Sequence, residues 1–316
     1  MDLGQQVMLM VSEELGAVVW QDPLLDTLVA ADVLSLYIEE QAPRLKAISE
    51  GELSIVTSGV VTNSEKTARL RVEDGPDGWT VDGDGGSVQH LRSAQEVLLS
   101  IPLEGGESLF LIPVDRVGMS STVRVDVAKS PWYDLHFDGL HLRREDFVGR
   151  VDERMRSVTA RARMRQAGFL IGIAGGALSE AVQYTAFRRQ FDKRIIDNQA
   201  VGMRLASLSG RLEAVRLKAQ QAAWLDDTGE DALRAATEAL AMAAELALES
   251  ERESLHFHGS FGMTKMALAH LYYTRGAVEA MRYGTVHSLW LEAGRLRVEE
   301  AKASSLPQTF AQPVHA

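Results

Sequence analysis

The sequence of 316 residues contains no cysteine. Disulfide bonds, thiolate nucleophiles, cysteine-ligated zinc and iron–sulfur clusters are therefore excluded. The absence is typical of a cytoplasmic protein, and we expect that location. Positive charge is also scarce, because 33 Lys and Arg residues stand against 44 Asp and Glu residues and leave a net charge of −11. Nucleic-acid-binding proteins usually carry a basic face, so we expect no nucleic-acid partner.

Long hydrophobic runs are missing as well. The longest apolar stretch, residues 167–178, is far shorter than the roughly 20 residues that a transmembrane helix needs, so we expect no membrane span. The first basic residue is Arg44, and the N-terminus therefore lacks the charged start of a secretion signal. No metal-ligand spacing is evident, since His256 and His258 would diverge on a helix. The sequence predicts a soluble protein with no metal site.

The spacing of apolar residues changes twice along the chain. Residues 7–48 carry them at helical spacing. Residues 53–148 switch to short strand-like runs separated by clusters of Gly, Asp and Pro, such as the one at residues 74–78. One further cluster, residues 83–86, lacks the spacing of a phosphate-binding loop, and we expect a hairpin turn there. This middle part is predicted to be a small antiparallel β domain.

The remainder of the chain is Ala-rich and helical up to about residue 302. Breaks near residues 192–198, 226–230 and 258–264 divide it into about four helices with short connections, for which a four-helix bundle is the economical arrangement. We therefore expect an α+β fold with four parts: an N-terminal helical domain at 1–50, a middle β domain at 51–148, a four-helix bundle at 149–302 and a loose tail at 303–316.

Several short segments, taken together, resemble the acyl-CoA dehydrogenase family. The resemblance covers most of the chain, and it implies that family's fold of a helical domain, a β domain and a four-helix bundle. The segments are Gly172–Ala177 followed by Tyr184, then Arg188-Arg189-Gln190-Phe191 with Lys193, Ile195 and Gln199, then His258-Gly259-Ser260-Phe261-Gly262, and finally Tyr283-Gly284-Thr285.

The resemblance implies FAD as the cofactor. In the family two subunits share each FAD, and an Arg-x-Gln-Phe turn and a Gln-x-x-Gly-Gly turn reach into the partner's site to hold the adenine and pyrophosphate. A guanidinium suits this task because it offers a fork of donors to phosphate oxygens. The alternative is that Arg188 and Arg189 only stabilise a helix C-terminus. The implied cofactor-binding residues are Arg188, Gln190, Phe191, Ile195, His256, Gly259, Ser260 and Thr285.

The chain departs from the family pattern in the binding segments. His256 replaces the Gln of the second turn and Ser260 replaces its second Gly, while Asp192 stands where a Gly should follow Phe. Only Thr57 is kept from the β-domain stretch that lines the flavin ring in the family. The resemblance also implies that the N-terminal helical domain at residues 1–50 is truncated, because the family's opening helices have no counterpart.

The family's catalytic carboxylate is absent from both of its usual places. A Glu removes the α-proton of the acyl thioester in the family, and Tyr283 occupies its position, while Ala162 occupies the alternative one. A phenol is a poor base at neutral pH, and the loss of a positioned base costs at least about 10²–10⁴-fold in rate. Tyr283 is nevertheless the candidate catalytic residue of this chain.

Three functions remain open. In the first, the chain pairs with a full-length acyl-CoA dehydrogenase paralogue, or with itself, in a dimer or heterotetramer that completes an FAD site for desaturation of an acyl thioester. In the second, the fold is repurposed, and Tyr283 with His287 or His256 performs non-redox acid–base chemistry on an acyl substrate. In the third, the chain is a flavin-free scaffold.

Overall fold

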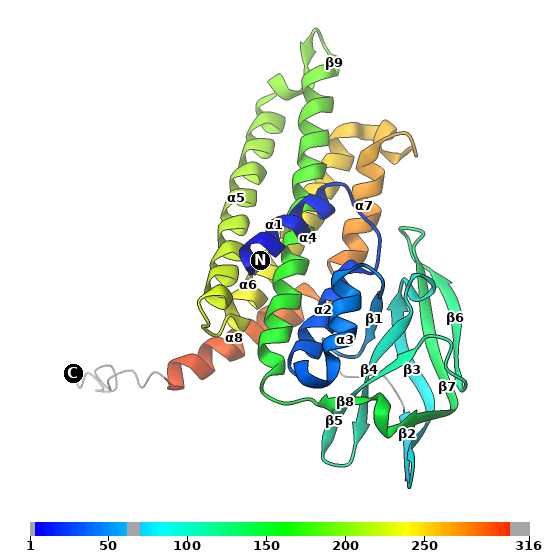
Figure 1. Ribbon diagram of the computed structural model, residues 1–316. Coiled ribbons are helices and arrows are strands. Elements are labelled where there is room, and N and C mark those ends of the chain that lie inside the picture. Colours follow the sequence, from blue (N-terminus) through cyan, green and yellow to red (C-terminus); the bar gives the residue numbers. More distant parts are fainter. Residues whose placement is uncertain (1–3, 62–69, 304–316) are drawn as a thin grey trace, which may run out of the picture.

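The structure is a computed structural model that describes residues 4–61 and 70–303 of the chain. A tall helical bundle is flanked near its lower end by a β region (Figure 1). Across the two described ranges, no helix combines the length and the apolar character needed to cross a membrane. Three helices precede the β region: α1 (Gln5–Ala17), α2 (Leu24–Ser35) and α3 (Ile38–Ser49).

The β region consists of two four-stranded sheets, in the orders β1-β4-β5-β8 and β2-β3-β7-β6. Apolar side chains of both sheets, among them Val97, Phe110 and Leu140, form a shared core. The strands are β1 (Ile55–Ser58), β2 (Leu70–Gly75), β3 (Gly78–Gln89), β4 (Glu96–Leu103), β5 (Gly106–Pro113), β6 (Met119–Val125), β7 (Pro131–Arg143) and β8 (Phe147–Arg150).

Two details of the β region differ from the sequence prediction. Strand pairs are antiparallel except for β1 and β4, which are parallel. Between these two strands the chain passes through β2 and β3, which belong to the other sheet. Residues 83–86 form no turn, since they lie within β3, where the register with β7 shifts twice. Glycines supply the extra backbone freedom of these bulges, and Gly86 has a φ of +85°. The turn between β2 and β3 lies at residues 75–78, inside the Gly and Pro cluster identified from the sequence.

Residues 155–303, the described part of the C-terminal region, contain five helices, where the sequence predicted about four. The predicted breaks near residues 192–198, 226–230 and 258–264 are present, and an additional one at 280–285 separates the last two helices, where Gly284 has a φ of +123°. α7 packs on α4 and α6, and α8 packs on α6. The helices are α4 (Met155–Phe187), α5 (Gln199–Asp227), α6 (Leu233–His258), α7 (Leu268–Glu279) and α8 (Val286–Ala303).

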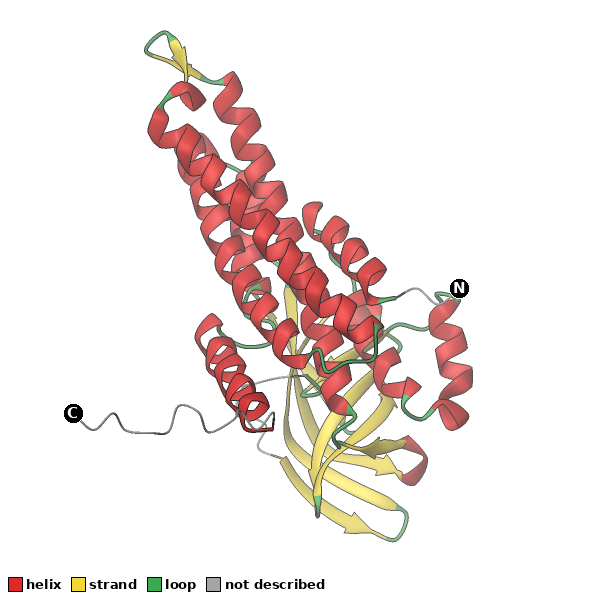
Figure 2. Ribbon diagram, turned by 90° about the vertical axis from the view of Figure 1, so that its left-hand side faces the viewer, coloured by secondary structure: helices red, strands yellow, loops and turns green. Residues whose placement is uncertain are grey.

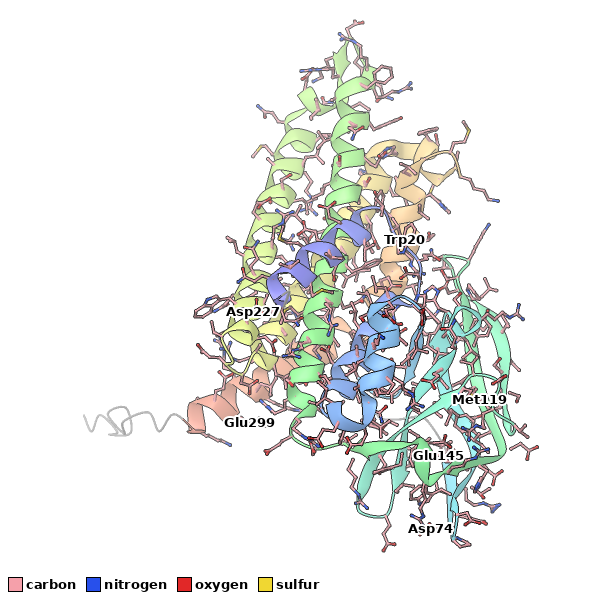
Figure 3. The ribbon with its side chains drawn as sticks, viewed as in Figure 1. Trp20, Asp74, Met119, Glu145, Asp227 and Glu299 are labelled. Carbon is pink, nitrogen blue, oxygen red and sulfur yellow. The ribbon has the colours of Figure 1, made fainter. Side chains whose placement is uncertain are left out.

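α1 crosses α4 at very short range. A Cβ atom on Gly172 of α4 would lie 2.0 Å from the carbonyl oxygen of Glu13, and one on Gly16 of α1 would lie 1.9 Å from that of Phe169. Only glycine fits at either position, so the glycines fix how closely the two helices approach. The α1 N-terminus is held by Asp227, labelled in Figure 3, whose carboxylate accepts hydrogen bonds from the first backbone N–H groups of the helix.

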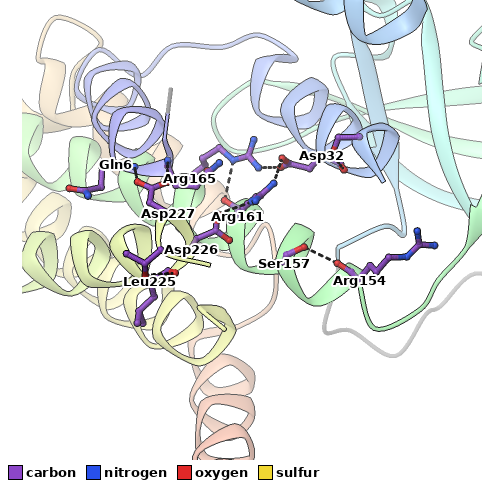
Figure 4. Close-up of polar contacts among 12 residues, drawn as sticks. Gln6, Asp32, Arg154, Ser157, Arg161, Arg165, Leu225, Asp226 and Asp227 are labelled. Carbon is purple, nitrogen blue, oxygen red and sulfur yellow. Dashed lines mark hydrogen bonds and ion pairs between the residues drawn. The ribbon is translucent and has the colours of Figure 1, made fainter. Parts of the chain in front are cut away.

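Ion pairs fasten α2 to the bundle (Figure 4). Arg161 of α4 lies 3.4 Å from Asp32 of α2 and 2.9 Å from Asp226 of α5, and Arg165 also pairs with Asp32. Burial raises the pKa of Asp226, which the charge of Arg161 opposes. These contacts hold the N-terminal helices in place beside the cavity described below.

Candidate functional site

A pocket of about 830 Å³ opens at the end of the bundle farthest from the sheets. A short hairpin lies at this end of the bundle (Figures 1 and 2). Its two strands have two residues each, β9 (Arg189–Gln190) and β10 (Lys193–Arg194). The pocket lies between the hairpin, the start of α5 and the end of α6. Six of the eight residues predicted to bind the cofactor line it: Arg188, Gln190, Ile195, His256, Gly259 and Ser260.

The hairpin reverses through Phe191 and Asp192, which both have left-handed backbone angles, with φ of +51° and +63°. Such a turn favours Asn-Gly, so this pair holds it at a cost in strain. Arg189 closes the turn by donating a hydrogen bond to the Asp192 carbonyl (2.8 Å). Phe191 is 94% exposed, and neither turn residue lines the pocket. The Asp192 carboxylate, whose negative charge would repel a pyrophosphate, therefore lies at the tip of the hairpin and does not line the pocket.

Arg188 supplies the pocket's available positive charge. Its exposed guanidinium has no hydrogen-bond or ion-pair partner among the described residues. The pocket's other arginine, Arg204, is neutralised by Glu249 at 2.6 Å and Glu253 at 2.9 Å. A phosphate group entering the pocket would thus meet one cation that no carboxylate already holds.

An aromatic stack forms one wall of the pocket. The ring of His258 lies 4.2 Å from that of Tyr184, and Tyr184 lies 5.9 Å from Phe261 and nearly parallel to it. His258 Nδ1 donates to the carbonyl oxygen of Ser254 (2.7 Å), which fixes the ring. Gly259 ends α6 with a φ of +60°, a conformation that glycine adopts readily. In the sequence these aromatic residues appear only as parts of short motifs, and they become pocket walls because helices α4 and α6 bring them together.

Tyr283 lies elsewhere, in a cavity of about 200 Å³ between the sheets and the α7–α8 connection. Its side chain is 94% buried, and its hydroxyl has no hydrogen-bond partner within residues 4–61 and 70–303. Burial raises the pKa of Tyr283 and the charge of Asp26 adds to this, while Arg282 opposes it. The phenol is therefore neutral at physiological pH and suited to donating a hydrogen bond rather than to accepting a proton.

A buried charge network surrounds Tyr283. Arg282 lies 3.3 Å from Asp26 of α2 and 3.0 Å from Glu279, and Glu279 also pairs with Arg275 at 2.9 Å. Burial alone would raise the pKa of Glu279, but the charges of Arg282 and Arg275 hold it below its ordinary value. This network was not predicted from the sequence, although Arg275, Glu279 and Arg282 recur at helical spacing.

The remaining predicted residues have structural surroundings. Thr285 is exposed and lines neither pocket, and its Oγ1 accepts the backbone N–H of Ser288 (3.1 Å), which caps α8. Ala162 is buried inside α4. Thr57 lines the cavity and donates to Asp26 (3.1 Å). No carboxylate therefore stands at either of the positions from which the resemblance derives a base.

Residues 153–293 match a family model described as the C-terminal domain of acyl-CoA dehydrogenase. The chain is 30% identical to a 3-(aryl)acrylate reductase of Clostridium sporogenes over 48% of this chain and 39% of that protein. It is 29% identical to the caffeyl-CoA reductase-Etf complex subunit CarC of Acetobacterium woodii, over 51% and 44%. It is 27% identical to acyl-CoA dehydrogenase FadE12 of Mycobacterium tuberculosis, over 70% and 61%. The matches thus span less than two thirds of these relatives.

Solved structures match a larger part of the chain. The Tcur3481-Tcur3483 steroid ACAD superimposes with a TM-score of 0.83 at 25% identity, over 95% of this chain and 82% of the other. Butyryl-CoA dehydrogenase of Megasphaera elsdenii has the same fold, with a TM-score of 0.81 at 19% identity over 92% and 81%.

Proposed function

The chain belongs to the acyl-CoA dehydrogenase family, and from this membership we propose that it is one subunit of a heteromeric acyl-CoA dehydrogenase. In this role it lends its outer pocket to an FAD whose ring is held by a full-length catalytic subunit. The observation that carries the proposal is the position of Arg188, which is unpaired and lines an open pocket together with five other predicted cofactor-binding residues.

The outer pocket fits the adenine and pyrophosphate end of FAD. Arg188 is suited to a phosphate because its guanidinium has no competing carboxylate. Gln190 and Ser260 offer further hydrogen-bonding groups along the same wall, and the aromatic stack offers flat apolar surface. When bound, FAD accepts the two electrons removed from an acyl thioester. This chain's own residues bind and orient one end of that cofactor.

The side chains around the inner cavity support the proposal that a partner subunit supplies the catalytic base. The carboxylates of the network beside Tyr283 already have partners. Asp26 accepts hydrogen bonds from Thr57 and Arg282, and Glu279 forms ion pairs with two arginines. Releasing Glu279 for proton abstraction would leave the buried Arg275 without its carboxylate, which costs several kcal/mol, and releasing Asp26 would leave Arg275 and Arg282 to share Glu279 alone. An inner cavity whose carboxylates are held in ion pairs and an open outer pocket are what a division of labour between two subunits requires.

Two of the similar proteins support assembly with another chain. CarC is named as a subunit of a reductase-Etf complex, and the steroid ACAD carries the joined names Tcur3481 and Tcur3483. We propose a corresponding arrangement for this chain, with a full-length paralogue as the partner and an acyl thioester as the substrate.

The test is the FAD affinity of the co-expressed complex after Arg188→Ala. Removal of a charge-assisted hydrogen bond should weaken FAD binding roughly 10- to 100-fold. Lys193→Ala is the matched control, because Lys193 is an exposed cation of the same hairpin that does not line the pocket, and it should retain wild-type affinity. Unchanged affinity in Arg188→Ala would contradict the proposal and favour the flavin-free scaffold.

A further inference from the structure

A third hollow, a surface groove of about 450 Å³, is lined by residues of α5, α6 and α8, which Figure 1 labels. One side of it belongs to α8, where Trp290, Gly294 and Arg297 follow at spacings of four and three residues and so share a helix face. None of the lining residues also lines the outer pocket or the inner cavity. The volume is within the range of pockets that hold small organic ligands.

Two cationic side chains converge at this groove. Lys218 Nζ lies 2.5 Å from one carboxylate oxygen of Glu238, and Arg297 Nη2 lies 3.6 Å from the other. The same carboxylate also pairs with Arg234 at 3.0 Å, and Arg234 has a second carboxylate partner in Glu300. Among the described residues, Lys218 and Arg297 pair with no carboxylate other than Glu238. The charged residues that line the groove are therefore two cations and one carboxylate, which leaves an excess of positive charge.

Arg297 is the cation best placed to hold a ligand. Its side chain is 72% exposed, and its contact with Glu238 is longer than a hydrogen bond. Within residues 4–61 and 70–303, no acceptor forms a hydrogen bond with its guanidinium. The fork of donors is therefore available to an anionic group that enters the groove.

Trp290 gives the groove a flat aromatic surface. Its indole Nε1 donates a hydrogen bond to Glu245 (2.9 Å), which orients the ring, and 38% of the residue remains exposed. Gly294, one turn further along the same face, leaves open space, because a Cβ atom there would meet no neighbour within 4 Å. Met242 and Ala293 add apolar surface. An aromatic ring can therefore lie against the indole and over Gly294.

We propose that this groove binds a planar aromatic carboxylate. The ring stacks on Trp290, and the carboxylate accepts hydrogen bonds from Arg297 and Lys218. The seven-residue spacing places the Cα atoms of Trp290 and Arg297 about 10 Å apart along α8, which suits a fused two-ring carboxylate. A neutral ligand gains no charge-assisted hydrogen bond, and an aliphatic acid lacks the aromatic contact. This site goes beyond the function proposed above, since it involves neither FAD nor an acyl thioester.

Calorimetric titration of the full chain with 2-naphthoate tests the proposal. The neutral 2-naphthamide and the non-aromatic cyclohexanecarboxylate should bind at least about 10-fold and 3-fold more weakly, respectively. Arg297→Met should weaken 2-naphthoate binding roughly 10-fold, and Trp290→Leu roughly 3- to 10-fold. Arg295→Met is the matched control, because Arg295 is an exposed cation of the same helix that does not line the groove.

The outer pocket also combines an arginine with aromatic rings, so Arg188→Ala is a second control and should bind 2-naphthoate like the wild type. The proposal is overturned if the wild-type chain does not bind 2-naphthoate, if 2-naphthamide binds equally well, or if a folded Arg297→Met variant keeps the wild-type affinity. Binding that is lost in Arg188→Ala and kept in Arg297→Met would place the ligand in the outer pocket and would equally contradict it.

Discussion

Arg282 and Asp26 are 256 residues apart in the chain and form an ion pair of 3.3 Å beside Tyr283. The pair joins the α7–α8 connection to α2, and both side chains are largely buried. Together with Glu279 it forms a compensated charge network. The buried charges beside Tyr283 are therefore compensated, whereas Arg188 in the outer pocket has no partner among the described residues.

Arg282→Met should destabilise the protein by about 3–5 kcal/mol, because it leaves Asp26 and Glu279 buried without their shared cation. Urea denaturation measures this change in the free energy of unfolding. Arg71→Met is the control, since Arg71 and Glu73 form an exposed pair that contributes at most about 1 kcal/mol. Equal effects of the two substitutions would contradict the assignment of the network as a structural element.

Gly172→Ala should lower stability by about 1–3 kcal/mol, because the new methyl group would meet the backbone of α1 at Glu13. Gly210→Ala on α5 is the matched control, since its Cβ would have no neighbour within 4 Å. We expect Gly210→Ala to gain about 0.5–1 kcal/mol from helix propensity. Thermal unfolding of the two variants should therefore shift in opposite directions, and a shift in the same direction would argue against the close α1–α4 contact.

Glu251 of α6 should make stability fall as pH rises. Burial raises the pKa of this carboxyl to about 9, and its Oε2 has no partner among the described residues. The folded protein thus holds a proton that the unfolded chain releases near pH 4 to 5, so the contribution is favourable at low pH and is lost progressively up to about pH 9. The slope should be about 1.4 kcal/mol per pH unit between pH 5 and pH 8.

Glu251→Gln should remove that slope and be more stable than the wild type at pH 8. Denaturant titrations at pH 6 and pH 8 measure the difference. Glu230→Gln, in the exposed loop between α5 and α6, should retain the wild-type dependence on pH. An identical slope in Glu251→Gln and the wild type would show that this carboxyl is not held protonated.

The sequence predicted the α+β class because apolar spacing reports local structure directly. The breaks at residues 192–198, 226–230 and 258–264 carry turn-forming residues, and each was found. The break at 280–285 was missed, because Met281 and Tyr283 continue the apolar pattern and only Gly284 marks the change. The parallel pairing of β1 with β4 was also missed, since strand partners depend on contacts distant in sequence.

Only part of the candidate site could be predicted, because sequence motifs report local structure and not contacts between residues distant in sequence. Short motifs identified six residues that the fold gathers at one pocket, and the roles assigned to them remain predictions. Phe191 and Thr285 share those motifs but lie outside the pocket, because one sits at a hairpin tip and the other caps a helix. The partners of Arg282 could not be foreseen, since no local pattern links it to Asp26.

The flavin content of the chain purified alone and co-purified with a full-length paralogue tests the central claim most directly. We predict no visible flavin absorbance for the chain alone and bound FAD in the complex. A yellow homodimer of this chain that oxidises an acyl thioester unaided would contradict the account.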